Sequence, residues 1–126
     1  MLVVDAANVI GSVPDGWWRD RAAAARRLRD ALVPVAASGL AELPGPLDIV
    51  LVVEGKARAV EPVPGVGVVA APGSGDDTIV EVVERRRSDP VYVVTADRAL
   101  RDRVTALGAR VLGPKAVRRQ DLGDTR

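Results

Sequence analysis

The chain has 126 residues, which suits a single domain, with a net charge of +1 and a hydrophobic content of 48%. It contains no cysteine and no histidine, so a disulfide framework, a zinc site of thiolates or imidazoles, a cysteine nucleophile and a histidine general base are all excluded. Any catalysis must use carboxylates, hydroxyls, basic groups or metal-bound water.

The hydrophobic runs of the chain are short. Each is shorter than the roughly 20 apolar residues that a helix needs to cross a bilayer. The apolar stretch near the N-terminus has no basic region before it and is interrupted by Asp5, so we expect no signal peptide. The sequence therefore predicts a cytoplasmic protein that does not bind to or insert into a membrane.

The first half of the chain is predicted to hold two strands and one long helix. A short apolar strand over residues 2–4 is followed by a loop that contains glycine and proline. A helix is expected from about residue 18 to 33, because its apolar residues recur at three- and four-residue spacing, and Pro34 is expected to end or kink it. The continuous apolar run over residues 49–53 is typical of a buried parallel strand.

The second half continues the alternation of strands and helices. It predicts, in order, a strand over 66–70, a helix over 77–86, a strand over 91–94, a helix over 97–107 and a strand over 110–112. This order indicates an α/β fold with three layers and a mainly parallel, five-stranded sheet. We expect one domain over residues 1–117 and a polar C-terminal tail over residues 118–126.

Acidic side chains follow the predicted strands. Asp5, Glu54 and Asp97 each come after an apolar run, and the pair Asp76 and Asp77 opens a predicted helix. Because neighbouring parallel strands end at the same edge of a sheet, we expect these carboxylates to converge there. Clustered carboxylates repel one another unless a cation is present, and oxygen ligands suit Mg²⁺ or Mn²⁺. The sequence therefore predicts a metal site that acts on phosphate groups.

Each of these acidic residues also has a purely structural explanation, which for Glu54 is a buried pairing with Lys56 or Arg58. Asp5 could initiate a turn, with Asn8 forming a local backbone hydrogen bond. Asp76, Asp77 and Asp97 suit the first turn of a helix, where carboxylates cap free N–H groups. We favour a functional role for Asp5, because burial beside the first apolar strand would otherwise penalise its charge. Asp76 and Asp77 are not distinguished by sequence.

Three segments of the chain resemble the signature segments of NYN domains in the PIN-like nuclease superfamily. They are Val-Val-Asp-Ala-Ala-Asn-Val-Ile at 3–10, Gly-Asp-Asp-Thr-Ile at 75–79 and Val-Val-Thr-Ala-Asp-Arg at 93–98. The likeness extends from residue 2 to about 114 and is greatest to the bacterial YacP-like branch. It implies a Rossmann-like, PIN-type fold and a metal-dependent endoribonuclease. Such an enzyme hydrolyses RNA phosphodiester bonds in line and leaves a 5′-phosphate and a 3′-hydroxyl.

The resemblance also implies a role for individual residues. The carboxylates that would hold Mg²⁺ or Mn²⁺ are Asp5, Asp76 or Asp77, and Asp97. Asn8 and Thr95 would support the site and position water, and Glu54 stands where such domains often carry another acid. Basic side chains beside these acids are candidates for contacts to RNA phosphates. They are Lys56, Arg58 and Arg98.

The chain has few aromatic residues on which an RNA base could stack. Trp17 and Trp18 lie in the loop or first turn after Asp5, where they could stack on an unpaired base. Such residues also pin the start of a helix against the core, and we favour that interpretation. The small chain also leaves room for a homodimer or a protein partner that helps to select the substrate.

Two other classes of protein stay open. The first is a catalytically inactive PIN-like module that binds RNA or protein, for which RNA binding would survive loss of the acids. The second is a phosphatase that forms an aspartyl phosphate. Such an enzyme would carry Asp-x-Asp after its first strand, whereas the second position here is Ala7.

Overall fold

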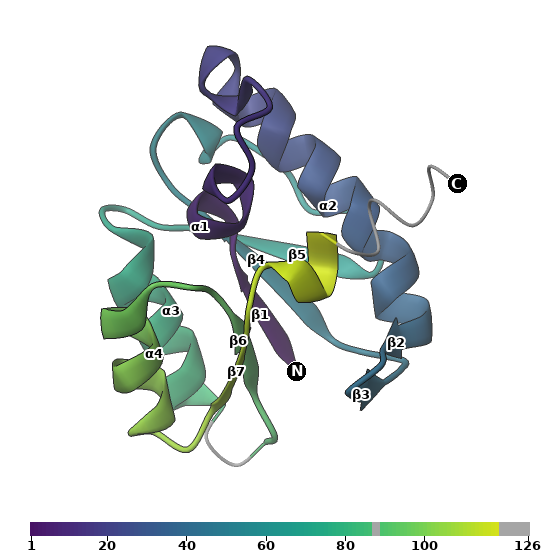
Figure 1. The fold of residues 1–126 in the computed structure, drawn as a ribbon, viewed down its shortest axis with the longest axis vertical. Coiled ribbons are helices and arrows are strands. Elements are labelled where there is room, and N and C mark those ends of the chain that lie inside the picture. The colour runs from purple at the N-terminus through teal and green to yellow at the C-terminus, as the bar shows by residue number, and fades with distance from the viewer. Residues whose placement is uncertain (87–88, 119–126) are drawn as a thin grey trace.

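A central parallel sheet lies between two layers of helices in the computed structural model, which describes residues 1–86 and 89–118 (Figure 1). The five strands lie in the order β5-β4-β1-β6-β7, and every neighbouring pair is parallel. They are β1 (Leu2–Asp5), β4 (Ile49–Val53), β5 (Val66–Ala70), β6 (Tyr92–Val94) and β7 (Arg110–Leu112). The predicted α/β fold with a five-stranded parallel sheet is confirmed.

Helices cover both faces of this sheet (Figure 1). The helices α1 (Ala6–Gly11) and α2 (Arg21–Ser38) pack on one face, and α3 (Gly75–Arg85) and α4 (Arg98–Thr105) pack on the other. The domain also contains two 3₁₀ turns, η1 (Trp17–Arg19) and η2 (Gly55–Ala57), and a small hairpin of β2 (Gly39–Leu40) and β3 (Leu43–Pro44). None of the helices in the described ranges is long and apolar enough to cross a membrane.

The central strand β1 is buried on both faces. Leu2 and Val4 pack under α1 and α2, whereas Val3 packs under α3 and α4, as the alternation of side chains along a strand requires. The run of aliphatic residues in β4 serves both layers in the same way. The residue that ends β1, Asp5, therefore lies at the middle of the carboxyl edge of the sheet.

The helix α2 differs from its prediction at both ends. It begins at Arg21, because the Asp20 carboxylate accepts a hydrogen bond from the Ala23 N–H at 3.0 Å and caps the first turn. It continues through Pro34 to Ser38, so of the two predicted effects of Pro34, an end or a kink, the end does not occur. Burial of Val35 and Ala36 in the core offsets the hydrogen bond that the proline removes.

Two short elements were not predicted. The helix α1 directly follows β1, where the sequence indicated a loop, and its N-cap is Asp5. The hairpin of β2 and β3 lies between α2 and β4. Both elements are too short for a periodic pattern to indicate them, since a two-residue strand or a six-residue helix shows less than two periods.

The C-terminal end of the described chain is tied to the rest of the domain. Residues 115–118 are helical, and the Arg118 guanidinium pairs with the Asp15 carboxylate at 3.3 Å. The first residue of the predicted tail is therefore part of the folded structure. The remaining tail residues, 119–126, lie outside the described residues.

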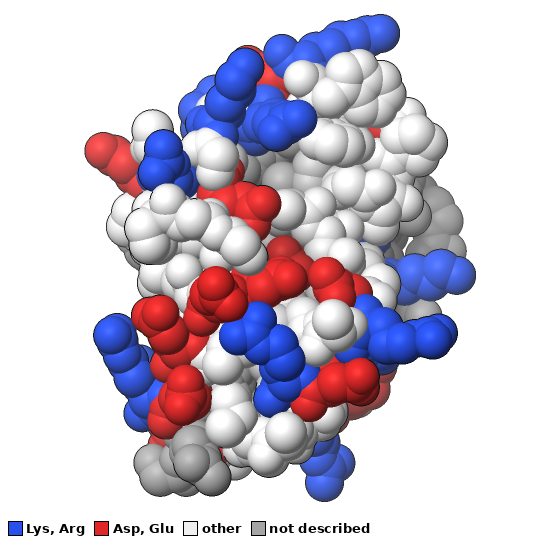
Figure 2. All heavy atoms as spheres, turned by 90° about the vertical axis from the view of Figure 1, so that its left-hand side faces the viewer, with Lys and Arg blue, Asp and Glu red and all other residues white. Residues whose placement is uncertain are grey.

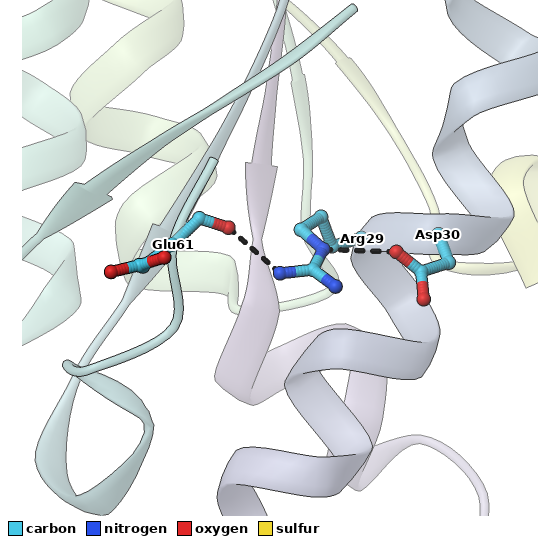
Figure 3. A network of polar contacts seen from close by, with 3 residues as sticks. All are labelled: Arg29, Asp30 and Glu61. Carbon is cyan, nitrogen blue, oxygen red and sulfur yellow. Dashed lines mark hydrogen bonds and ion pairs between the residues drawn. The ribbon is translucent and has the colours of Figure 1, made fainter. Parts of the chain in front are cut away.

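A buried arginine ties α2 to the segment that follows η2 (Figure 3). The Arg29 side chain is only 13% exposed, and its Nη1 donates a hydrogen bond to the backbone carbonyl of Glu61 at 2.8 Å. Its Nε donates to the Asp30 carboxylate at 2.9 Å. The interaction spans two elements that are far apart in sequence, so it fixes how the segment after β4 lies on α2.

We expect Arg29→Ala to lower the free energy of unfolding by about 1–3 kcal/mol, because a charged donor and its apolar stem are lost from a nearly buried position. Urea unfolding measures the change. Arg26→Ala is the matched control: Arg26 is exposed on the same helix and forms no ion pair within the described residues. Equal loss of stability in the two variants would contradict the structural role of Arg29.

Candidate functional site

An open cavity of about 350 Å³ lies at the carboxyl edge of the sheet. Its polar lining consists of Asp5, Asn8, Glu54, Ser74, Asp76 and Asp97. Figure 2 shows a band of acidic side chains across this side of the molecule, with basic side chains above and below it. Four of the five acids singled out in the sequence thus line one cavity, which we call the acidic cavity.

Asp5 is the most deeply placed residue of the acidic cavity. Its side chain is held by two hydrogen bonds: Oδ2 accepts from the Thr95 hydroxyl at 2.9 Å, and Oδ1 accepts from the Asn8 N–H at 3.4 Å. Only 4% of Asp5 is exposed. Burial raises the pKa of its carboxyl to about 6, and the nearby charges of Asp76 and Glu54 act in the same direction.

A hydrogen-bond network joins β1 and α1 to the loop between β6 and α4. The Asn8 side-chain oxygen accepts from the Ala96 N–H at 2.8 Å. The Thr95 hydroxyl, which donates to Asp5, accepts from the Asp97 N–H at 3.1 Å. Thr95 is fully buried, and its hydroxyl holds the Asp5 carboxylate in position from inside the protein. A role for Thr95 in positioning water stays a prediction.

The Asp97 carboxylate has two roles in the structure. Its Oδ1 accepts from the Leu100 N–H at 3.1 Å, so it caps α4 as the structural interpretation predicted. It also lines the acidic cavity. Since a carboxylate has two oxygens with two lone pairs each, capping leaves acceptor capacity for a ligand.

Glu54 reaches the start of α3 rather than a nearby basic side chain. Its Oε2 accepts a hydrogen bond from the Gly75 N–H. A Cβ atom at position 75 would collide with this carboxylate, so glycine is the residue that allows the approach. The alternative pairing of Glu54 with Lys56 or Arg58 is not found within the described residues.

The structure separates the two aspartates that the sequence left undistinguished. Asp76 lines the acidic cavity, and its pKa is raised by burial and then by the charges of Asp97 and Glu54. Asp77 instead pairs with Arg103 of α4 at 3.0 Å, and its side chain is 72% exposed. Successive residues of a helix differ in direction by about 100°, so the two carboxylates leave α3 on different sides.

Sequence reasoning missed Ser74. Its hydroxyl accepts from the Asp76 N–H at 3.1 Å and caps α3, and it also lines the acidic cavity. The signal was present, because serine directly before a helix that opens with two acids is a preferred N-cap. This cap fixes where α3 begins and therefore which of the two aspartates faces the cavity.

The acids of the cavity lack basic partners. No Lys or Arg in residues 1–86 and 89–118 forms an ion pair with Asp5, Glu54, Asp76 or Asp97. In the same ranges, no three acidic side chains stand close enough together to hold one ion jointly. Mg²⁺ usually keeps several waters and takes only one or two protein carboxylates directly. The donor set therefore fits a hydrated Mg²⁺ or Mn²⁺ rather than an ion enclosed by protein ligands.

The predicted RNA-binding residues lie on the elements that border these acids. Lys56 belongs to η2, and Arg58 directly follows it and donates from Nε to the Gly55 carbonyl at 3.2 Å. Arg98 is the first residue of α4, next to Asp97. All three are exposed. Their contacts to RNA stay a prediction.

This topology, a parallel sheet between helices with acidic residues from several elements at its carboxyl edge, defines a Rossmann-like α/β domain. One solved structure that shares this fold is that of Rae1 (YacP) from Bacillus subtilis. Its crystal structure matches with a TM-score of 0.76 at 15% identity, over 100% of this chain and 76% of that chain. A mutant of the same protein matches with a TM-score of 0.73 at 17% identity, over 99% and 77%.

These identities are low, so the likeness establishes the fold and leaves the chemistry to be argued from the site. No family model matches the sequence, and no curated protein matches it. The resemblance to NYN domains that the three sequence segments indicate is confirmed at the level of the fold.

The raised pKa of Asp5 predicts a pH-dependent stability in metal-free protein. The stabilising contribution of the protonated carboxyl is complete below about pH 4 and is lost as the pH rises through about 6. We expect the free energy of unfolding to fall by up to about 3 kcal/mol over this window, relative to an Asp5→Asn variant that stays neutral. Urea unfolding in EDTA at several pH values measures this difference.

The matched control for this titration is Glu84→Gln. Glu84 is exposed on α3 and forms no ion pair within the described residues. The Glu84→Gln variant should therefore show the same dependence of the unfolding free energy on pH as the wild type. If Asp5→Asn also kept it, the carboxylate would not be held in its buried environment in solution.

Proposed function

We propose that this protein is a metal-dependent endoribonuclease that hydrolyses RNA phosphodiester bonds at the acidic cavity. One observation carries the proposal: four carboxylates from different elements line one cavity and have no basic partner within the described residues. They are Asp5, Glu54, Asp76 and Asp97. The PIN-like fold supports nuclease chemistry, and the resemblance of the three segments to NYN domains implies RNA as the substrate.

The proposed cofactor is a hydrated Mg²⁺ or Mn²⁺, which one or two of Asp5, Asp76 and Asp97 would bind directly and the others through its water molecules. Glu54 adds negative charge at the same cavity. When bound, such an ion supplies charge neutralisation for a phosphodiester and a lowered pKa for a nearby water. Asp77 is left out of the proposed ligands because Arg103 already pairs with it.

The chain itself prepares this cavity for a cation. Thr95 and the Asn8 N–H fix the orientation of the Asp5 carboxylate before any ligand arrives. Burial makes the charged form of Asp5 costly, so a cation beside it lowers the free energy of the folded protein. Preorganised charge of this kind needs no rearrangement when charge develops on the substrate.

RNA would approach through the basic side chains beside the cavity. Lys56, Arg58 and Arg98 are exposed and can contact phosphates that flank the bond to be cleaved. A homodimer or a protein partner could extend this surface and add substrate selection. Contacts to the sugar-phosphate backbone position the strand without reading its sequence.

A catalytically inactive module that binds RNA or protein is the second candidate. The spacing of the carboxylates favours it, because no three of them in the described ranges hold one ion jointly. Such a module would bind RNA equally well after loss of the acids. The nuclease would lose cleavage while it keeps its fold.

Neighbouring aspartates provide the decisive comparison for cleavage. We expect Asp76→Asn to reduce metal-dependent RNA cleavage about 100-fold or more, and Asp77→Asn to keep it within a few-fold, because only Asp76 lines the cavity. End-labelled single-stranded and structured RNAs are incubated with Mn²⁺, Mg²⁺ or EDTA. Asp5→Asn and Asp97→Asn should be as inactive as Asp76→Asn.

Three results would count against the proposal. Cleavage that persists in EDTA, or equally in all four variants, would come from another site or a contaminant. Equal losses in Asp76→Asn and Asp77→Asn would show that the separation of the two side chains is wrong. No cleavage by any protein, with unchanged RNA binding in the variants, would favour the inactive module.

A second prediction tests the support of Asp5 by Thr95. We expect Thr95→Val to lower cleavage about 10- to 100-fold, because it removes the donor to Asp5 and the acceptor of the Asp97 N–H. The hydroxyl lowers the pKa of Asp5, so the pH at half-maximal activity should move upward in Thr95→Val. Thr95→Ser keeps the hydroxyl and should restore the profile. A loss of rate without a shift in the pH profile would contradict this role.

A further inference from the structure

A second cavity, of about 260 Å³, adjoins the acidic cavity. Its walls are mostly apolar and come from α1, η1, α2 and η2, with Ala6, Ile10 and Ala57 among them. It also contains one aromatic side chain, Trp17, and one cation, Arg21. The two cavities share Ala7 and Glu54 as lining residues, so they are neighbours on the surface.

The indole of Trp17 is held in place at this second cavity. It packs partly against the core beneath α1 and α2, so the preferred interpretation of the tryptophan pair holds for Trp17 but not for the exposed Trp18. The Arg21 guanidinium lies 5.5 Å from the centre of the Trp17 ring. The Trp18 ring packs edge-on against the Trp17 ring, with ring centroids 5.7 Å apart. Trp18 itself is 51% exposed and does not line the cavity.

We propose that this second cavity binds one unpaired nucleobase of the RNA strand whose backbone lies in the acidic cavity. The inference rests on the proposed function, because that function supplies the RNA. Single-stranded nucleic acid is commonly held by stacking of its bases on aromatic side chains and on arginine planes. Trp17 and Arg21 offer both kinds of surface to one apolar space.

Glu54 connects the two cavities chemically. One of its carboxylate oxygens, Oε2, accepts from the Gly75 N–H and is fixed at the start of α3. The carboxylate has further acceptor capacity, which suits the N–H groups on the edge of a base. The base and the phosphate of one nucleotide are close to each other, so the base can lie in the second cavity while the phosphate lies in the neighbouring acidic cavity.

The pocket also discriminates between forms of RNA. A base inside a duplex is paired and stacked on its neighbours, so it must be removed from the helix before it can enter an enclosed space. An unpaired base in a loop or a single strand avoids most of that cost. The protein should therefore prefer single-stranded RNA, independently of the metal.

Trp17 provides its own spectroscopic probe. The chain has two tryptophans, so Trp18→Phe leaves Trp17 as the only indole. A short single-stranded RNA is titrated into this variant, in EDTA and again with Mg²⁺, and the same RNA annealed to its complement is the control. We expect the single strand to quench the fluorescence of Trp17 and the duplex to leave it unchanged.

The matched affinity measurement uses labelled RNA and fluorescence anisotropy in EDTA. We expect Trp17→Leu to weaken binding of the single strand about 5- to 150-fold, the range found for loss of one stacked base. Trp17→Phe should retain most of the affinity, and Trp18→Phe all of it. Circular dichroism checks that each variant is folded. If Trp17→Leu does not fold, the fluorescence titration decides alone.

The outcomes separate this inference from the proposed function. Quenching of Trp17 by single-stranded RNA without any cleavage would support the base pocket and overturn the nuclease. Metal-dependent cleavage with neither quenching nor a loss of affinity in Trp17→Leu would overturn the base pocket and leave the nuclease intact. Equal quenching by the duplex, or no RNA binding at all, would also overturn the base pocket.

Discussion

The constraint on which the rest of the structure depends is the burial of one carboxylate, Asp5, at the end of the central strand. Because β1 lies between β4 and β6, its last residue faces protein on both sides and has almost no contact with water. A charge in such a place must be hydrogen-bonded. Thr95 and the Asn8 N–H supply these bonds, and the bond from Thr95 links the end of β1 to the segment that follows β6.

The same residues serve the fold and the site, so the structural and functional explanations do not exclude each other. Asp5, Ser74 and Asp97 cap α1, α3 and α4, which all begin at the acidic cavity. The N-terminal end of a helix carries partial positive charge, which reduces the cost of gathering carboxylates there. It does not remove that cost, because burial still raises the pKa of both Asp5 and Asp76.

The sequence predicts the sheet and the meeting of the acids, because both follow from short-range patterns. Aliphatic runs indicate buried parallel strands, and strands that share a direction bring their ends together. The separation of Asp76 from Asp77 could not be predicted, since it depends on the Ser74 cap and on an Arg103 side chain supplied by another helix. The passage of α2 through Pro34 also depends on tertiary packing, which propensity does not report. The second cavity is formed by α1, η1, α2 and η2 together with Glu54, and α1 was not predicted from the sequence.

Electrostatics explains why two adjoining cavities of different character suit one polyanionic substrate. Without a cation, the carboxylates repel a phosphodiester, so the acidic cavity alone cannot hold RNA. The apolar cavity beside it gains binding energy from a base, which is uncharged and is not repelled. A base held there would keep the strand next to the carboxylates, and a hydrated ion would then remove the repulsion at the phosphate. Affinity for the strand and chemistry at the phosphate are thus assigned to different groups of residues, with Glu54 at the boundary between them.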